Sequence, residues 1–136
     1  MDREKINFFK SELRNLRYYN RKIDEAKKER EKAINKLTGV KSPNENTEII
    51  SSATPSGNAN LYYWMHKEEE YTAIINEHQK RVDYVWSVLN KMEFEDRKAV
   101  IEIYSNNKNR ENIALTCFMD VSTLQRRIDK LINKFA

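Results

Sequence analysis

The sequence predicts an all-α protein in which a long N-terminal antiparallel helical hairpin, coiled-coil-like in its packing, is followed by a small C-terminal helix-turn-helix bundle. Three observations favour this fold. The 136 residues include only 2 Gly and 2 Pro, so the usual helix breakers are nearly absent. Apolar residues recur at three- and four-residue spacing over two long segments, which is the period of an amphipathic helix. Residues 93–136 instead divide into short helical pieces separated by polar turns.

The first long segment, residues 2–37, contains no Gly or Pro. Its apolar side chains recur so that they share one face of a helix. They are Ile6, Phe9, Leu13, Leu16, Tyr19, Ile23, Ala26, Ala33, Ile34 and Leu37. Gly39 follows in the position where glycine often ends a helix. The pattern predicts a single amphipathic helix of about 36 residues.

A second long helix is predicted after a polar segment. Residues 38–59 are rich in Ser, Thr, Asn, Pro and Gly, and we expect them to form a mobile loop. The helix is expected to begin near Asn60, which suits an N-cap, and to continue to Met92. The residues expected to be buried along its seam are Trp64, Tyr71, Ile75, Val82, Val85 and Leu89.

A helix with one apolar stripe must bury it against another surface. The first long helix is the predicted partner, folded back as the antiparallel hairpin, and a second copy of the chain is the alternative for one or both stripes. Because two long, narrow helices bury little core by themselves, we expect a homodimer. Residues 1–92 are therefore predicted to serve oligomerisation or partner contact, and residues 93–136 to form a separate domain.

Residues 93–136 are predicted to form three short helices, with the first polar turn at Asn106-Asn107-Lys108-Asn109. The helices are expected at Phe94–Ser105, Arg110–Phe118 and Val121–Phe135. Small Ala114 suits a close helix crossing, and Asp120 suits the N-cap of the last helix. The face of the last helix expected to pack inward consists of Leu124, Ile128, Leu131 and Phe135, opposite a polar face that includes Asp129. This order of elements predicts a helix-turn-helix unit.

Three stretches of this region follow a known pattern. They are Phe94-Glu95-Asp96-Arg97-Lys98-Ala99-Val100-Ile101-Glu102-Ile103-Tyr104, then Ile113-Ala114, then Thr123-Leu124-Gln125-Arg126-Arg127-Ile128. Together they resemble the fourth region of bacterial sigma factors, which reads the −35 promoter element. With its charged N-terminal helix and the segment Gly39-Val40-Lys41-Ser42-Pro43, the whole chain is similar to phage late-gene regulators of the RinA and ArpU type. Phe118 departs from the pattern, because the turn usually has Gly there.

The resemblance implies a phage or prophage transcriptional activator of late, packaging or morphogenesis genes. In a helix-turn-helix unit the second helix lies in the major groove, with its N-terminal residues nearest the base edges. Gln suits adenine and Arg suits guanine there, because each can form two hydrogen bonds to the base. The residues expected to contact double-stranded promoter or operator DNA are Arg110, Ser122, Thr123, Gln125, Arg126, Arg127 and Lys130.

The net charge of +4 agrees weakly with an anionic partner. Residues 1–37 carry 12 basic and 7 acidic side chains, whereas residues 93–136 carry 8 and 7, so the basic excess lies outside the predicted DNA-binding domain. The basic row on the first helix comprises Lys10, Arg14, Arg17 and Arg21. We interpret it as a solvated face, with contact to phosphate or to host RNA polymerase as the alternative.

Several classes of function are not expected. The chain has no recognisable phosphate loop, carboxylate pair or nucleophile-base motif, so we predict no catalytic residue, no enzyme activity, no cofactor and no small-molecule substrate. His66 and His78 lie too far from any Cys or further His to predict a metal site. Without a long apolar run, and with a single cysteine, we expect a protein of the bacterial host cytoplasm with no membrane contact.

Two other functions fit the same pattern. A small terminase subunit also joins a helix-turn-helix to oligomerising helices, and it would assemble as a ring rather than as a dimer. An interaction protein that binds a host factor without touching DNA is the second alternative. The sequence does not distinguish activation from repression, nor does it identify the operator.

Overall fold

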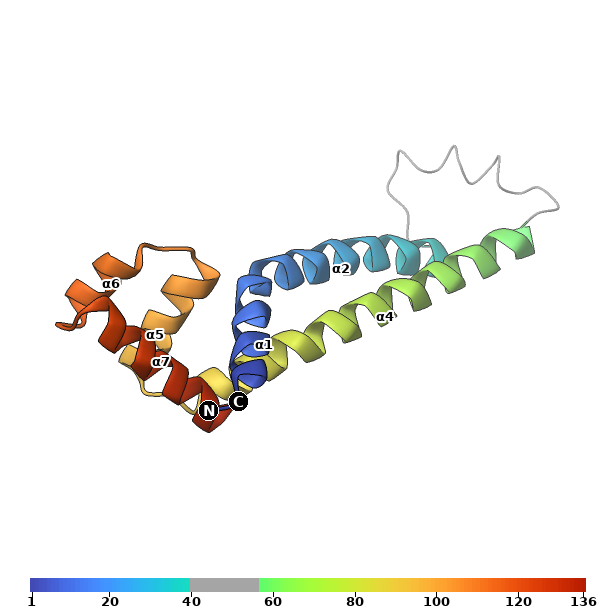
Figure 1. Ribbon diagram of the computed structural model, residues 1–136. Helices are drawn as coiled ribbons and strands as arrows, with labels where there is room; N and C mark the ends of the chain where they lie inside the picture. Colours follow the sequence, from blue (N-terminus) through green and yellow to red (C-terminus); the bar gives the residue numbers. More distant parts are fainter. Residues whose placement is uncertain (40–56) are drawn as a thin grey trace. The chain divides into compact units, whose positions relative to one another are not determined.

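The computed structural model describes residues 1–39 and 57–136, with the backbone alone for residues 57–59. Every regular element in this part of the chain is helical, which confirms the all-α prediction (Figure 1). The elements are α1 (Arg3–Arg14), α2 (Leu16–Thr38), α4 (Gly57–Leu89), α5 (Phe94–Val100), the π-helical turn η2 (Ile101–Ser105), α6 (Arg110–Thr116) and α7 (Val121–Phe135). The predicted mobile loop lies for the most part outside the described residues.

The N-terminal segment forms two helices, so the prediction of one continuous helix over residues 2–37 is wrong. The first helix is capped by Asp2, whose carboxylate accepts a hydrogen bond from the backbone N–H of Lys5 at 3.1 Å. It ends at Arg14, and Asn15 is the C-cap. Asparagine has a low helix propensity, because its side chain can compete for backbone hydrogen bonds. The second helix ends at Thr38, and Gly39 follows with a φ of +75°, which confirms the predicted glycine stop.

The second long helix begins at Gly57, three residues before the predicted N-cap at Asn60. It contributes to both of the compact units into which the chain divides. Unit 1 consists of residues 1–20 and 80–136, and unit 2 of residues 21–79. The predicted division at residue 92 differs from this one, because both ends of the segment 1–92 belong to the same unit as the C-terminal helices.

Polar and aromatic contacts explain why the end of α4 belongs to unit 1. The rings of Phe9 on α1 and Tyr84 on α4 meet edge to face with centroids 6.1 Å apart. The hydroxyl of Tyr19 donates to the buried carboxylate of Glu12 at 3.0 Å and accepts from Arg81 at 3.0 Å. The apolar core of the unit draws on all its helices, and its most deeply buried members are Ile6, Phe9, Leu13, Val85, Val88, Leu89, Val100, Ile128 and Ile132.

In unit 2, α2 and α4 run in opposite directions (Figure 1). The helices bury Ile23, Ala26 and Ala33 from α2 and Ile75 from α4. Of the six predicted seam residues, Trp64 and Tyr71 are only half-buried, whereas Val82, Val85 and Leu89 are buried in unit 1 rather than here. The predicted seam is therefore divided between two cores, and the paired hairpin over residues 1–92 stays a prediction.

Candidate nucleic-acid interface

Helices α6 and α7 are joined by a four-residue turn, Cys117 to Asp120. The first of the two helices, α6, is capped by Asn109, whose side-chain oxygen accepts from the backbone N–H of Glu111 at 2.9 Å. The turn is closed by the backbone N–H of Met119, which donates to the carbonyl of buried Ala114 at 3.0 Å. The predicted order of short helix, turn and amphipathic helix is present, with α6 ending two residues earlier than expected.

Phe118 occupies the turn in a left-handed conformation, with a φ of 57°. This is the position at which the sequence departs from the usual Gly. A left-handed backbone costs an L-residue about 1–2 kcal/mol, and the ring recovers little by packing, because Phe118 is 96% exposed. The turn therefore keeps the geometry that favours glycine and stores strain to do so.

The inward face of α7 is rotated from the predicted one. Leu124 and Ile128 are buried as expected, but the third buried apolar residue is Ile132, whereas Leu131 and Phe135 are half-buried. Asp129, predicted on the solvent face, is 6% exposed. The reason lies in α1, which packs against α7 and supplies cations to this carboxylate.

Asp129 is the centre of a hydrogen-bonded ion network. Its carboxylate accepts from Lys10 at 2.7 Å, from Arg3 at 3.0 Å and from the side-chain amide of Gln125 at 3.0 Å. The Gln125 amide nitrogen also donates to the hydroxyl of Tyr104 at 2.9 Å. Burial raises the pKa of Asp129, but hydrogen bonds and charge from Lys10, then Arg3 and Gln125, lower it by more, so the pKa lies below its usual value.

Two of the predicted DNA-contacting residues are therefore occupied by partners within the protein. Gln125 is half-buried between Tyr104 and Asp129. Arg127 forms two hydrogen bonds with the Asp96 carboxylate of α5, at 2.8 and 3.2 Å. Both N–H donors of the Gln125 amide are used in these contacts, so Gln125 could not donate to a base without breaking one of them. Arg127 uses two of its five donors on Asp96, and that pair holds its guanidinium against α5.

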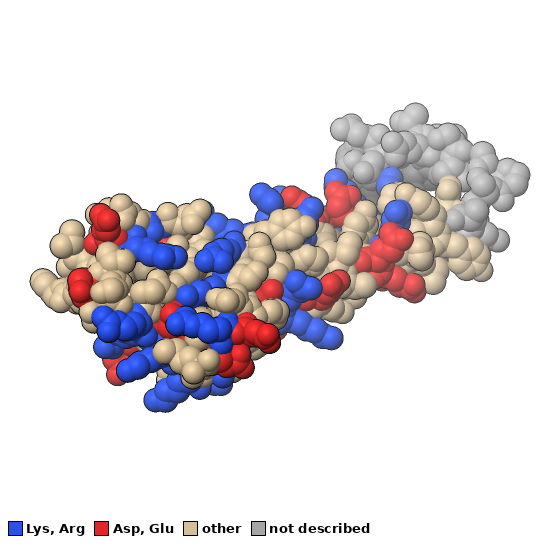
Figure 2. Space-filling view, viewed as in Figure 1, with Lys and Arg blue, Asp and Glu red and all other residues tan. Residues whose placement is uncertain are grey.

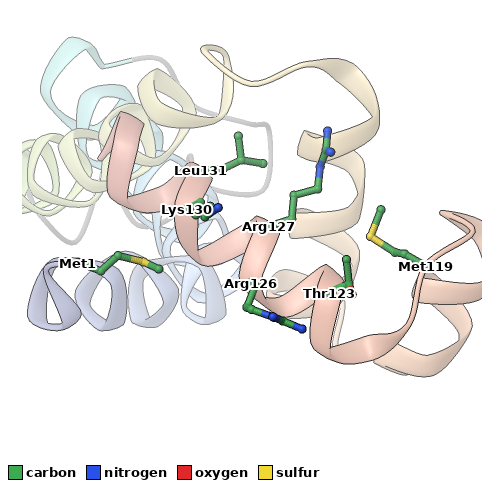
Figure 3. A pocket seen from close by; sticks show the side chains of 7 residues that line it. All are labelled: Met1, Met119, Thr123, Arg126, Arg127, Lys130 and Leu131. Atoms are coloured by element: carbon green, nitrogen blue, oxygen red, sulfur yellow. The ribbon is translucent and has the colours of Figure 1, made fainter.

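The exposed face at the start of α7 carries the remaining predicted residues. Ser122, Thr123, Arg126 and Lys130 are all exposed. Arg126 donates only a long 3.4 Å bond to the carbonyl of Ser122, and within the described chain neither it nor Lys130 has a carboxylate within ion-pair distance. Thr123, Arg126 and Lys130 border a hollow of about 630 Å³. The side chains of Arg126 and Arg127 leave α7 in opposite directions (Figure 3).

One acidic side chain lies beside this face. Asp120 occupies the N-cap position of α7, but its carboxylate accepts no hydrogen bond from a backbone amide of the helix, so the predicted cap is wrong in its bonding. The carboxylate instead accepts from the Ser122 hydroxyl at 3.3 Å. A side-chain hydrogen bond from Thr123 lowers the pKa of Asp120, and the charge of Arg126 contributes to the same shift.

Arg110 lies apart from the residues on α7, at the first position of α6. Its guanidinium carbon is 5.6 Å from the centroid of the Tyr104 ring. The sequence did not identify Tyr104 as a site residue, nor Lys10 and Arg3 as counter-ions of α7. These contacts join residues far apart in the chain, 126 positions in the case of Arg3 and Asp129, and no local pattern reports them.

No family model, curated protein or solved structure matches this chain. Among the described residues there is no cluster of His, Cys, Asp and Glu that could hold a metal ion. Nor does any helix in that part of the chain have the length and apolar character needed to span a bilayer. The geometry of α6 and α7 is therefore the basis on which a function can be argued.

Proposed function

We propose that the protein is a sequence-specific DNA-binding transcriptional regulator, in which α7 enters the major groove and α6 crosses the DNA backbone. The observation that carries the proposal is the exposed start of α7, next to a tight interhelical turn. Among the described residues no carboxylate lies within ion-pair distance of Arg126 or Lys130 there, although the charge of Arg126 acts on the nearby Asp120. Arg can form two hydrogen bonds to guanine, whereas a lysine one turn further along suits phosphate. On the face drawn in Figure 2, Lys and Arg side chains are spread over this part of the chain, with Asp and Glu among them.

The resemblance to phage late-gene regulators of the RinA and ArpU type extends this proposal to a phage or prophage activator of late genes that acts as a homodimer and contacts host RNA polymerase. The set of residues proposed to face DNA is smaller than the set predicted from the sequence. Ser122, Thr123, Arg126 and Lys130 lie on the exposed face of α7, and Arg110 lies apart from them on α6. Gln125 and Arg127 are assigned to holding α7 in place, because their donors bind Tyr104, Asp129 and Asp96.

Binding of a host protein without DNA is the second candidate, and one observation favours it. The turn between α6 and α7 exposes two large apolar side chains, Phe118 at 96% and Leu115 at 72%. Exposed apolar side chains close together are typical of protein-binding surfaces. The two candidates differ in what they require of Arg126 and Lys130, which matter to base and phosphate contacts but not to an apolar contact at the turn.

The test compares Arg126→Ala and Lys130→Ala with the wild-type protein. A cognate duplex is first selected from genomic fragments, and affinities are measured on it and on a scrambled duplex at several salt concentrations. We expect Arg126→Ala to cost about 1–3 kcal/mol on the cognate duplex and to relax base preference. Lys130→Ala should weaken both duplexes equally and reduce the salt slope by about one unit.

Lys98→Ala is the matched control. This substitution also removes one exposed positive charge, but from α5 rather than from α7. Wild-type protein that binds no duplex in a salt-dependent manner would refute the proposal. If Arg126→Ala lowers both affinities by the same factor, Arg126 contacts phosphate and the proposed docking of α7 is wrong.

A further inference from the structure

Three cations gather around the ring of Tyr104, which is itself only 3% exposed. The Lys10 ammonium lies 5.3 Å from the ring centroid, and the guanidinium carbons of Arg14 and Arg110 each lie 5.6 Å from it. Lys10 and Arg14 belong to α1 and Arg110 to α6, two helices that lie far apart in the sequence. Since a ring has two faces, at least two of the three cations share one face.

Only one of these charges is neutralised. Lys10 is paired with Asp129 at 2.7 Å. Arg14 and Arg110 are both exposed, and no carboxylate in the described part of the chain lies within ion-pair distance of either. Their distances from one centroid keep the two guanidinium groups within roughly a Debye length of each other, about 10 Å at 0.1 M salt, so their repulsion is not fully screened.

The geometry of a stacked guanidinium leaves its hydrogen-bond donors available. A guanidinium held over a ring by cation–π attraction uses none of its N–H donors on the ring, so these donors stay available to another acceptor. Each guanidinium can therefore donate to an oxygen of a backbone phosphate, which would offset its charge. A phosphate group has the charge and the oxygen geometry that arginine binds best.

We propose that Arg14 and Arg110, here called the Tyr104 arginine pair, form a phosphate-binding site for the backbone of the same DNA duplex that α7 reads. The inference rests on the proposed function and places a residue of α1 in the DNA interface. Its position is fixed by Tyr104, whose hydroxyl accepts from Gln125 on α7 while its ring carries the pair. Arg110 begins α6, the helix expected to cross the DNA backbone.

Arg17 lies beside this site and extends the row. Its guanidinium donates to the side-chain oxygen of Asn106 at 2.6 Å, directly after the η2 turn that carries Tyr104. Arg17 also lacks a carboxylate within ion-pair distance among the described residues. The basic excess of the N-terminal segment thereby acquires a role, because Arg14 on α1 and Arg17 at the start of α2 add phosphate contacts that the C-terminal helices do not supply.

The experiment measures affinity for the cognate and scrambled duplexes as a function of salt, using the full chain with Arg14→Gln, Arg110→Gln or both. Each single change should weaken both duplexes by about tenfold and reduce the salt slope by about 0.9, and the double change should reduce the slope by about twice as much. Base preference should not change, because phosphate contacts position the protein but carry no sequence information.

Arg14→Lys and Arg110→Lys keep the charge and should retain most of the salt slope, and Lys98→Gln removes one charge elsewhere and should leave it unchanged. Thermal melting of each variant identifies any loss of folding. If the wild-type protein binds DNA and the two Gln variants bind it equally well, the arginine pair is not part of the interface, while the proposed function stands. If the wild-type protein binds no duplex, both proposals fail.

Discussion

The ion network around Asp129 gives a sharp test of how α1 supports α7. Asp129→Asn preserves the shape of the side chain but removes the charge that faces Lys10 and Arg3. The Lys10 side chain is only 12% exposed, so its ammonium would lose its counter-ion with limited access to water. Breaking a buried ion pair costs about 3–5 kcal/mol. Because Lys10 keeps its contact with the Tyr104 ring, we expect Asp129→Asn to lower the free energy of unfolding by about 2–3 kcal/mol.

The same network predicts how stability depends on pH. The folded-state pKa of Asp129 lies below its usual value, because hydrogen bonds and charge from its partners outweigh the effect of burial. A carboxyl with a lowered pKa contributes stability above its unfolded pKa of about 3.9, and that stability is lost as the pH falls through the folded value. The wild-type protein should therefore lose its advantage over Asp129→Asn as the pH is lowered from about 5 toward 2.

Urea unfolding followed by circular dichroism at pH 7 and at acidic pH measures both effects. Arg3→Gln is the matched control, because the Arg3 side chain is 65% exposed and its pair with Asp129 should contribute less than about 1 kcal/mol. The reasoning is refuted if Asp129→Asn is as stable as the wild-type protein at pH 7, or if the two proteins respond to acid in the same way.

Two further predictions concern the turn and the long helix. Phe118→Gly should raise the free energy of unfolding by about 0.5–1 kcal/mol, because relief of the left-handed backbone strain outweighs the added entropy of the unfolded chain. Phe118→Ala keeps the strain and should give no gain. Equal stability of the two variants in thermal melting would contradict the strain argument. Ile75→Asp places a charge at a position that is 6% exposed, so it should reduce helicity and melting temperature. Ile74→Asp, at a neighbouring position that is 37% exposed, should have little effect. Similar melting of both variants would show that α4 has no buried face there.

Features of the fold that depend on local chemistry were predictable from the sequence. The scarcity of Gly and Pro and the three-four spacing predicted helices, and the described chain is helical. Gly39 and the polar turn at residues 106–109 also lie where expected, and each includes a residue with positive φ, Gly39 itself and Asn107. Such signals are local, because a glycine or an asparagine adopts the left-handed conformation at low cost wherever the neighbours are.

The burial of Asp129 and Gln125 was not predictable in the same way. Apolar spacing places the inward face of a helix within a broad sector, and Asp129 lies at the edge of that sector, next to Ile128. Whether such a carboxylate faces solvent or core depends on whether cations are available to neutralise it. Those cations, Lys10 and Arg3, come from the other end of the chain. The sequence pattern therefore identified the helix but not its rotation.

The network also bears on which part of the chain can carry the proposed interface. A fragment that begins at residue 93 would retain α6 and α7 but lack both cations that pair with Asp129. Its Asp129 would then have no counter-ion, and a charged carboxylate that turned to water would give up the hydrogen bond from Gln125. The exposed face of α7 is oriented by contacts with α1, so the unit proposed to bind DNA is the whole of residues 1–20 and 80–136.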